Sequence, residues 1–222
     1  MVKRESARQA WDRRAAGYDR AGDRMERLTI GDSREWICAR ARGRTLEVAV
    51  GTGRNLSRYG PDVDLVGLDL SPNMLAVARS RSEVLGRRVE LREGEAEHLP
   101  FPDASFDTVV CTLAVCAVGD RNAALTEMRR VLRPGGRLLL LDHAERRWLR
   151  GRPADLVLRF GFVVEARGRL RLGLIERLAA RKPAYGMFGR SADLQQRLAQ
   201  PGRVVGQRRP GRVVGSGALV AA

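Results

Sequence analysis

Cysteine and histidine are scarce in this sequence of 222 residues. Its three cysteines, Cys38, Cys111 and Cys116, include no CxxC pair, and the only histidines are His98 and His143. An odd number of cysteines without such spacing argues against a disulfide framework. We therefore expect reduced cysteines that pack as small apolar side chains, since the sequence places neither histidine as an obvious base for a nucleophilic cysteine. No metal site is predicted.

Long apolar segments are also missing. The longest run, Thr108 to Gly119, stops at Asp120 and falls short of the roughly 18 residues that a membrane span needs. The N-terminal segment MVKRESARQAWDRR is charged throughout, and it lacks the apolar middle and cleavage site of a secretory signal. These absences predict a soluble, cytoplasmic protein.

Lysine is nearly absent, although the formal net charge is +15. Lys3 and Lys182 are the only lysines, so the charge comes from arginine. Such a charge ordinarily points to nucleic acid or to an anionic membrane. Arginine together with abundant alanine and glycine is instead typical of GC-rich coding sequence, and no aromatics alternate with basic residues as a single-strand platform requires. We therefore do not expect nucleic acid as a partner, while peripheral contact with an anionic membrane and a homodimer stay open.

Short apolar runs alternate with polar helical patterns in the middle of the chain, which predicts an α/β fold with a parallel sheet. The best helix signal starts at Ser71, which can cap the helix, with Pro72 in the first helical position. A second helix is expected after a cap at Asp120, and RPGG at 133–136 should end it. The expected strands are β-branched or Leu-rich, as strands covered on both faces are, and they span residues 45–50, 64–69, 89–94, 106–112 and 137–142.

The two ends of the chain differ from this middle part. Residues 5–42 read as one or two helices rich in Arg and Asp. The C-terminal end contains PGRVVG twice, at 201–206 and 210–215, and its Gly, Arg and Pro content predicts a disordered or loosely attached tail. The expected apolar side of the leading helices comprises Trp11, Tyr18, Met25, Leu28, Trp36 and Ile37.

Three strand ends carry residues suited to an adenosine-containing cofactor. Glycines in the turn Gly51-Thr52-Gly53 let the backbone approach a ligand, and a helix expected from about Asn55 would offer free N–H groups. Asp69 ends the next strand, where a carboxylate can accept both hydroxyl hydrogens of a ribose. The glycine motif of a nicotinamide dinucleotide site has a third glycine at the position of Leu56, so the sequence disfavours a dehydrogenase.

The third strand end decides between the remaining cofactors. Glu95 and Ala96 can present a carboxylate and an N–H group to an adenine edge, and LPFP can wall the ring. In this order and spacing, LEVAVGTG, GLDLSPNML, AEHLPFPDASFD and RRVLRPGGRLLLLDH resemble the class I S-adenosylmethionine-dependent methyltransferases. More narrowly, they resemble the branch of quinone-biosynthesis C-methyltransferases and related small-molecule and lipid methyltransferases. The resemblance covers about Trp11 to Pro183.

The resemblance implies a Rossmann-like, doubly wound, mostly parallel seven-stranded sheet with helices on both faces, S-adenosyl-L-methionine as cofactor, and a small-molecule or lipid-like acceptor of quinol, phenol or amine type. Thr52 corresponds to a position that holds the methionine end, and Tyr18 to an aromatic that closes over the cofactor. Ala49 stands where the family more often has Gly. The implied cofactor-binding residues are Tyr18, Glu47, Ala49, Gly51, Thr52, Gly53, Asp69, Leu70, Met74, Glu95, Ala96 and Thr112.

The acceptor side is less well defined. His143, next to Asp142, is the candidate general base, and His98 is expected to be structural. Two alternatives stay open. An RNA acceptor fits the charge, although no Asn/Asp-Pro-Pro-aromatic stretch follows the fourth strand. A cofactor-binding protein with little turnover fits the short lid of about ten residues, with Trp148 and Leu149, before the late helix at 154–160 and two last strands.

Together these features divide the chain into three expected parts. Residues 1–43 form helices that cover the cofactor site, residues 44–183 form the methyltransferase domain, and residues 184–222 form the tail.

Overall fold

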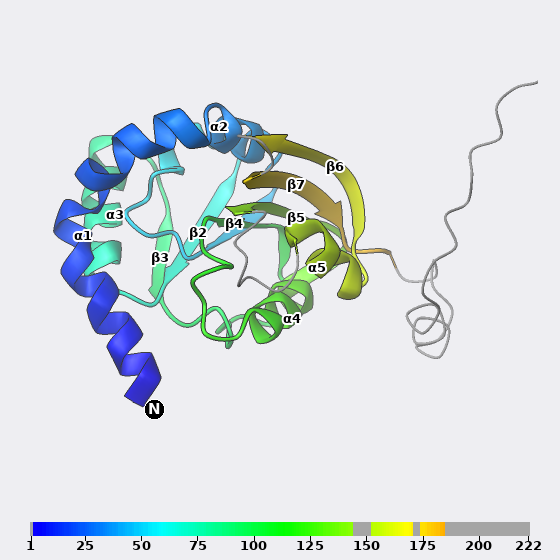
Figure 1. Ribbon diagram of the computed structural model, residues 1–222. Coiled ribbons are helices and arrows are strands. Elements are labelled where there is room, and N and C mark those ends of the chain that lie inside the picture. The colour runs from blue at the N-terminus through cyan, green and yellow to red at the C-terminus, as the bar shows by residue number, and fades with distance from the viewer. Residues whose placement is uncertain (1, 144–151, 171–173, 185–222) are drawn as a thin grey trace, which may run out of the picture. The chain divides into compact units, whose positions relative to one another are not determined.

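A computed structural model describes residues 2–143, 152–170 and 174–184, which belong to one compact unit (Figure 1). The predicted lid, with Trp148 and Leu149, and the predicted tail lie outside the described residues. The elements, in chain order, are α1 (Val2–Thr29), α2 (Ser33–Cys38), β1 (Arg44–Val48), the short 3₁₀ helix η1 (Leu56–Arg58), β2 (Asp64–Asp69), α3 (Pro72–Val84), β3 (Glu90–Glu93), β4 (Phe106–Thr112), α4 (Arg121–Val131), β5 (Leu132–His143), α5 (Pro153–Arg159), β6 (Val163–Leu170) and β7 (Ile175–Arg181).

The seven strands form one sheet in the order β3-β2-β1-β4-β5-β7-β6. β1 to β5 pair in parallel, whereas β7 runs antiparallel to both β5 and β6. This confirms the predicted doubly wound, mostly parallel sheet with late helix and last strand pair. The chain order reverses between β1 and β4, and the carboxyl ends of parallel strands at such a reversal are where α/β sheets bind ligands.

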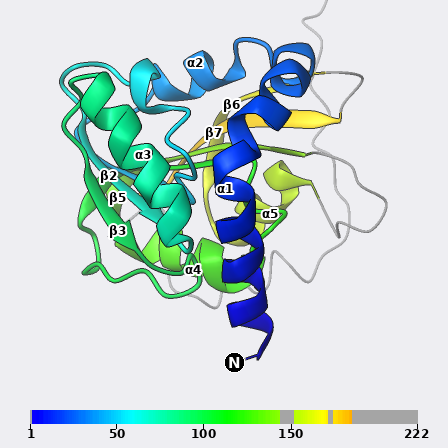
Figure 2. The same cartoon turned by 90° about the vertical axis from the view of Figure 1, so that its left-hand side faces the viewer.

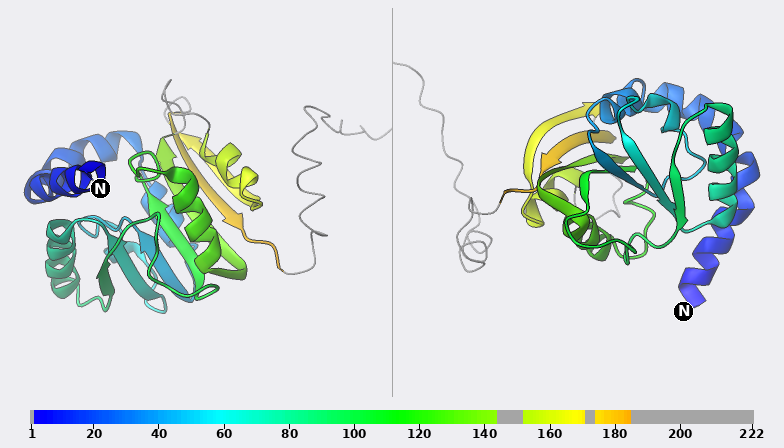
Figure 3. Two further views of the ribbon diagram at one scale, coloured as in Figure 1. Left: turned by 90° about the horizontal axis from the view of Figure 1, so that it is seen from below. Right: turned by 180° about the vertical axis from the view of Figure 1, so that it is seen from behind.

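Helices cover both faces of the sheet, as Figure 3 shows. The LLLL run of β5 explains why both faces must be covered. Leu138 and Leu140 pack in one apolar core with Met128 of α4, while Leu139 and Leu141 pack in a second core on the other face. Successive side chains of a strand point to opposite faces, so an unbroken apolar run is stable only between two layers of helices.

The predicted helix starts are confirmed in detail. The Ser71 hydroxyl accepts a hydrogen bond from the backbone N–H of Met74 at 3.1 Å, and Pro72 opens α3. The carboxylate of Asp120 accepts from the backbone N–H groups of Asn122 and Ala123 at 2.9 and 3.1 Å. Both caps satisfy N–H groups that have no partner within the helix.

The prediction of a helix from about Asn55 was wrong, because only a short 3₁₀ helix forms there. This helix, η1, has hydrogen bonds between residues three apart, such as that from the Arg58 N–H to the Asn55 carbonyl at 2.9 Å. Pro61 follows within a few residues and biases Gly60 away from the helical region. The free N–H groups of an α-helix are therefore absent from this turn.

Two smaller predictions also need correction. Leu28 was placed on the apolar side of the leading helices, yet it is 56% exposed. RPGG was expected to lie between a helix and a strand, whereas α4 ends at Val131 and residues 133–136 form a bulge within β5. Gly135 adopts φ +79° in that bulge, which explains the glycine there. The side chain of Met25 lies outside the described residues, and Ile37 is fully buried as predicted.

No helix in the described ranges is long and apolar enough to cross a membrane.

Candidate functional site

A cavity of about 450 Å³ lies at the carboxyl ends of β1, β2 and β4. Its volume is within the range of small-molecule sites. Nine of the twelve predicted cofactor residues line it, and Glu47, Thr52 and Gly53 do not. The nine are Tyr18, Ala49, Gly51, Asp69, Leu70, Met74, Glu95, Ala96 and Thr112.

Asp69 is a buried acid of the cavity wall that backbone groups hold in place. Its Oδ2 accepts the backbone N–H of Gly51 at 2.8 Å, and its Oδ1 accepts that of Ser71 at 2.9 Å. Burial raises the pKa of this carboxyl, and the backbone N–H groups of Ser71 and Gly51 oppose that rise. The backbone N–H of Leu70 opposes the rise as well. A carboxylate offers about four lone-pair positions, so these backbone bonds leave it capacity to accept from a ribose.

The backbone at the ends of β1 and β4 is strained where it meets the cavity. Gly51 has φ +57°, and an added Cβ would meet no atom within 4 Å. Ala49 and Leu113 adopt φ +56° and +55°, in the left-handed region that costs a residue with a Cβ about 1–2 kcal/mol. All three residues line the cavity, and such strain commonly collects at binding sites.

The loop after β3 lines the cavity with residues 94–98, whereas LPFP at 99–102, predicted to form the wall for an adenine ring, does not line it. Glu95 and His98 pair in an isolated antiparallel bridge, with the His98 N–H donating to the Glu95 carbonyl at 3.2 Å. Ala96 is buried and lines the cavity between them. His98, predicted to be structural, instead lines the cavity with a side chain that is 69% exposed.

Two aromatic residues of α1 close another side of the cavity. Trp11 and Tyr18 both line it, and their ring centroids lie 6.2 Å apart in an edge-to-face arrangement. Burial raises the pKa of the Tyr18 hydroxyl, with the charge of Glu26 as a second cause. Figure 2 shows α1 beside α3, so the N-terminal helix lies against the half of the unit that contains α3.

Acidic side chains spaced seven residues apart attach α1 to this half, a pattern that the sequence analysis missed. The Asp12 carboxylate accepts from the Ser71 hydroxyl and from the Asn73 N–H at the start of α3. Asp19 accepts from the Thr52 hydroxyl at 2.7 Å and pairs with Arg81. The residues Asp12, Asp19 and Glu26 are here called the acidic stripe, and a seven-residue spacing keeps them on one helix face.

Glu26, the last residue of the acidic stripe, forms an ion pair with the buried Arg34. It pairs with Arg34 at 2.6 Å and with Arg54 at 3.2 Å. Arg34 also donates to the Asn55 Oδ1 at 2.8 Å. Partly buried ion pairs of this kind are screened less by salt than exposed ones.

Glu47 lies beneath the cavity floor and is 2% exposed. Its carboxylate accepts from the Tyr59 hydroxyl at 2.9 Å and from the Asn55 amide at 2.7 Å. The same amide group donates to the Thr112 hydroxyl at 3.0 Å, and Thr112 lines the cavity. Burial raises the pKa of the Glu47 carboxyl to about 7. Glu47 therefore supports residues of the wall and does not itself face the cavity.

The remaining two predicted residues have packing contacts of their own. The Thr52 hydroxyl donates a hydrogen bond to Asp19, so it links α1 to the turn after β1. A Cβ on Gly53 would lie 2.7 Å from the Leu56 Cδ1 atom, so this glycine permits close packing of the turn. Neither contact involves the cavity.

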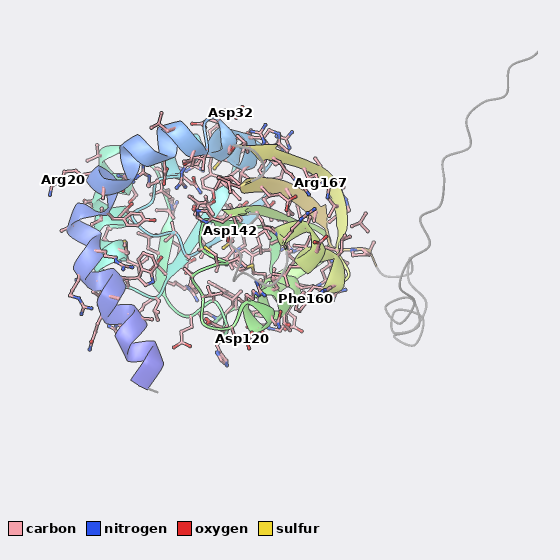
Figure 4. All side chains as sticks on the ribbon, in the orientation of Figure 1. Arg20, Asp32, Asp120, Asp142, Phe160 and Arg167 are labelled. Carbon is pink, nitrogen blue, oxygen red and sulfur yellow. The ribbon has the colours of Figure 1, made fainter. Side chains whose placement is uncertain are left out.

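On the acceptor side, a thiol, a carboxylate and an imidazole lie close together, from Cys116, Asp142 and His143. His143 Nδ1 lies 3.6 Å from Cys116 Sγ and 3.4 Å from Asp142 Oδ1. Asp142, labelled in Figure 4, is 2% exposed. The sequence analysis named Asp142 and His143 but did not connect Cys116 with them, and it treated all three cysteines as structural. Cys38 and Cys111 are buried and free, as predicted.

The sheet order and the strand-end site together define the class I S-adenosylmethionine-dependent methyltransferase fold. The family described as "Methyltransferase domain" matches residues 46–140, from β1 to near the end of β5. This part of the chain therefore has the sheet order of the class I methyltransferase fold and matches the sequence of a methyltransferase domain.

Known relatives agree with this assignment. The chain is 40% identical over 125 residues to a demethylmenaquinone methyltransferase of Deinococcus radiodurans, covering 52% of each chain. It is 43% identical over 106 residues to a phosphatidylethanolamine N-methyltransferase of Cereibacter sphaeroides, covering 47% of this chain and 52% of that one. The chain thus spans about half the length of these curated relatives.

A solved structure shows the same fold. The YcgJ protein of Bacillus subtilis aligns with a TM-score of 0.55 at 27% identity, over 62% of this chain and 72% of that one.

Proposed function

We propose that this chain binds S-adenosylmethionine in the cavity and transfers its methyl group to a small-molecule or lipid-like acceptor. The observation that carries the proposal is the convergence of Gly51, Asp69 and Glu95 on one cavity with the Trp11 and Tyr18 rings. The bound cofactor supplies an electrophilic methyl group on a sulfonium. The same proteins that resemble this chain are named for a quinone and for a phospholipid acceptor.

The residues present fit the cofactor. Asp69 keeps capacity for a ribose, because its backbone hydrogen bonds do not use all four lone-pair positions of the carboxylate. Glu95 and Ala96 lie together for the adenine edge, and the open space over Gly51 leaves room for a ligand against the backbone. Thr52 is no longer proposed to hold the methionine end, since its hydroxyl is bonded to Asp19.

The wall beyond the fourth strand favours an apolar acceptor. Leu113, Ala114, Ala117 and Val118 line the cavity there and offer apolar side chains. The chain's contribution to catalysis is to hold acceptor and cofactor in line and to exclude water. Such positioning can contribute about 7 kcal/mol or more to the lowering of the barrier. A charged RNA acceptor gains no specific support from this surface.

Calorimetric titration with S-adenosylmethionine and S-adenosylhomocysteine tests the cofactor site. Asp69→Ala should weaken binding by about 100-fold, because two hydrogen bonds to a charged acceptor are lost. Asp64→Ala is the matched control, since Asp64 lies on the same strand with a side chain that is 74% exposed. Equal affinity of the Asp69→Ala variant and the control would refute the ribose assignment.

Activity is tested separately, with quinol, phenol, amine and phospholipid acceptors and labelled cofactor. Transfer to an apolar acceptor is the expected result. Cofactor binding without transfer to any member of the panel would instead favour the binding-only alternative.

We also propose that the domain ends near Pro183 and that the tail is dispensable. Lys182 anchors the end of the described part of the domain, donating from Nζ to the Arg129 carbonyl at 2.8 Å. Truncation after Pro183 should leave the melting temperature and the cofactor affinity nearly unchanged. A drop of several degrees would show that the tail stabilises the domain.

A further inference from the structure

We propose that Cys116, Asp142 and His143 form a zinc-binding site on the acceptor side of the sheet. One donor atom from each residue lies within 4.8 Å of the others, and within the described ranges this is the only such group of three. The inference does not depend on the proposed methyl transfer. It revises the sequence analysis, which predicted no metal.

The donor set is the kind that Zn²⁺ selects. A thiolate sulfur, an imidazole nitrogen and a carboxylate oxygen are its usual protein ligands, whereas magnesium and calcium sites are built from oxygen. Three protein ligands leave the fourth position of a tetrahedral ion for water or another ligand, as in catalytic zinc sites.

Two of the three donor separations match those that a tetrahedral ion imposes, and the third, from Cys116 Sγ to Asp142, is within 4.8 Å. With a Zn–S length of about 2.3 Å and a Zn–N length of about 2.05 Å, tetrahedral angles place sulfur and nitrogen roughly 3.5 Å apart. Cys116 Sγ and His143 Nδ1 are 3.6 Å apart. The same geometry places nitrogen and oxygen roughly 3.4 Å apart, and His143 Nδ1 lies 3.4 Å from Asp142 Oδ1. The latter separation is longer than an ordinary N–H···O hydrogen bond.

Backbone hydrogen bonds hold the carboxylate in place. Asp142 Oδ2 accepts from the Cys116 N–H at 3.1 Å, and Oδ1 accepts from the His143 N–H at 2.7 Å. Ligating carboxylates in metal sites are themselves hydrogen-bonded in this way. The bond from Cys116 also ties the loop after β4 to the end of β5, while the bond from His143 stays within the end of β5.

The surrounding charge favours a cation. Asp142 pairs in register with Glu176 of β7, and both side chains are buried. The Glu176 Oε1 has no hydrogen-bond partner among the described residues, and it pairs with Arg169 Nε at 3.6 Å. Like charges directly opposite in a sheet destabilise it, and a divalent ion bound by Asp142 would offset this repulsion.

The site would also adjoin the cavity. Cys116 lies between Ala114 and Ala117, which both line it. A zinc-bound His143 could not serve as a general base through Nδ1, so the zinc site replaces that role with a Lewis acid near the acceptor.

The test uses the full-length chain without an affinity tag, stripped of metal by a chelator. Titration with Co²⁺ should give the absorption bands of tetrahedral cobalt together with a thiolate charge-transfer band. Both should saturate at one Co²⁺ per chain. Zinc competition against a chromophoric chelator then gives the affinity. Cys116→Ser should remove the charge-transfer band. His143→Gln should weaken zinc binding at least tenfold, since even an indirect partner of a metal ligand contributes about that much.

His98→Gln is the matched control, because it changes the chain's only other histidine, and Cys38→Ala is the control for the thiol. Both should keep the band and the affinity. Absence of zinc binding by the parent chain would overturn the proposal. Binding that persists in both Cys116→Ser and His143→Gln, or that falls equally in the controls, would also overturn it. Circular dichroism identifies a variant that fails to fold, and the spectrum of the parent chain with cobalt decides in that case.

Discussion

The two sides of the carboxyl edge of this sheet are built differently. On the cofactor side, backbone groups and single acids at the ends of β1, β2 and β3 meet one cavity, as Gly51 and Asp69 show. On the acceptor side, Cys116 comes from the loop after β4, and Asp142 and His143 come from the end of β5. The cofactor side thus depends on local strand-to-turn geometry. The acceptor side depends on side chains that the fold brings together.

The family match covers most of the cofactor side but only part of the acceptor side. Residues 46–140 include Asp69 and Cys116, and they end before Asp142 and His143. The role of Asp142 and His143 is therefore argued from this chain's own contacts. Changes on one side should accordingly leave the other side's ligand affinity unaltered, and the predictions below test this separation.

The largest expected effect concerns Glu47, below the cofactor side. Burial raises its pKa from 4.5 to about 7. A raised folded-state pKa contributes stability that is fully present below the unfolded pKa and is lost as pH rises through the folded value. The free energy of unfolding should therefore fall between about pH 4.5 and pH 7, by up to about 3 kcal/mol from this group.

Urea denaturation across that range measures the effect. Glu47→Gln should remove this part of the pH dependence, whereas Glu90→Gln, at an exposed position on β3, should not. An identical pH slope in both variants would show that Glu47 is not buried as a titrating carboxyl.

The next effect concerns the acidic stripe of α1. Asp19→Ala removes the contacts to Thr52 and Arg81, so α1 should open more often over the cavity. We expect S-adenosylmethionine affinity to fall about tenfold, or about 1.4 kcal/mol, and hydrogen exchange in α1 to rise. Arg20→Ala is the control, because Arg20 is exposed on the next position of the helix (Figure 4). Unchanged affinity would mean that α1 does not close the cofactor site.

The smallest effect concerns Ala49 at the end of β1. Its φ of +56° favours glycine. Ala49→Gly should stabilise the fold by about 0.5–1 kcal/mol, because relief of left-handed strain exceeds the added chain entropy of glycine. Thermal unfolding measures this change, with Ala41→Gly as a control at a buried alanine outside the left-handed region. Destabilisation at position 49 would contradict the strain argument.

Much of the fold follows from local pattern. The LLLL run of β5 and the caps at Ser71 and Asp120 are local features, and the structure confirms what they predict. Among the site residues, Asp69 and Glu95 are also found from strand-end position. The η1 turn was misjudged because Pro61 stops a helix soon after Asn55.

Other parts of the site depend on distant contacts. Thr52 and Asp19 are 33 residues apart, and Cys116 and His143 are 27 apart. No local propensity links such pairs, so the roles of Thr52, Asp19 and Cys116 emerge only once the chain is folded.

The most direct test compares two isosteric changes, Asp69→Asn and Asp142→Asn, by titrating each protein with S-adenosylmethionine and with zinc. Asp69→Asn should weaken cofactor binding at least tenfold and leave zinc affinity unchanged, and Asp142→Asn should do the reverse. Variants that lose both ligands together, or neither, would contradict the separation of a cofactor side from a metal-binding acceptor side.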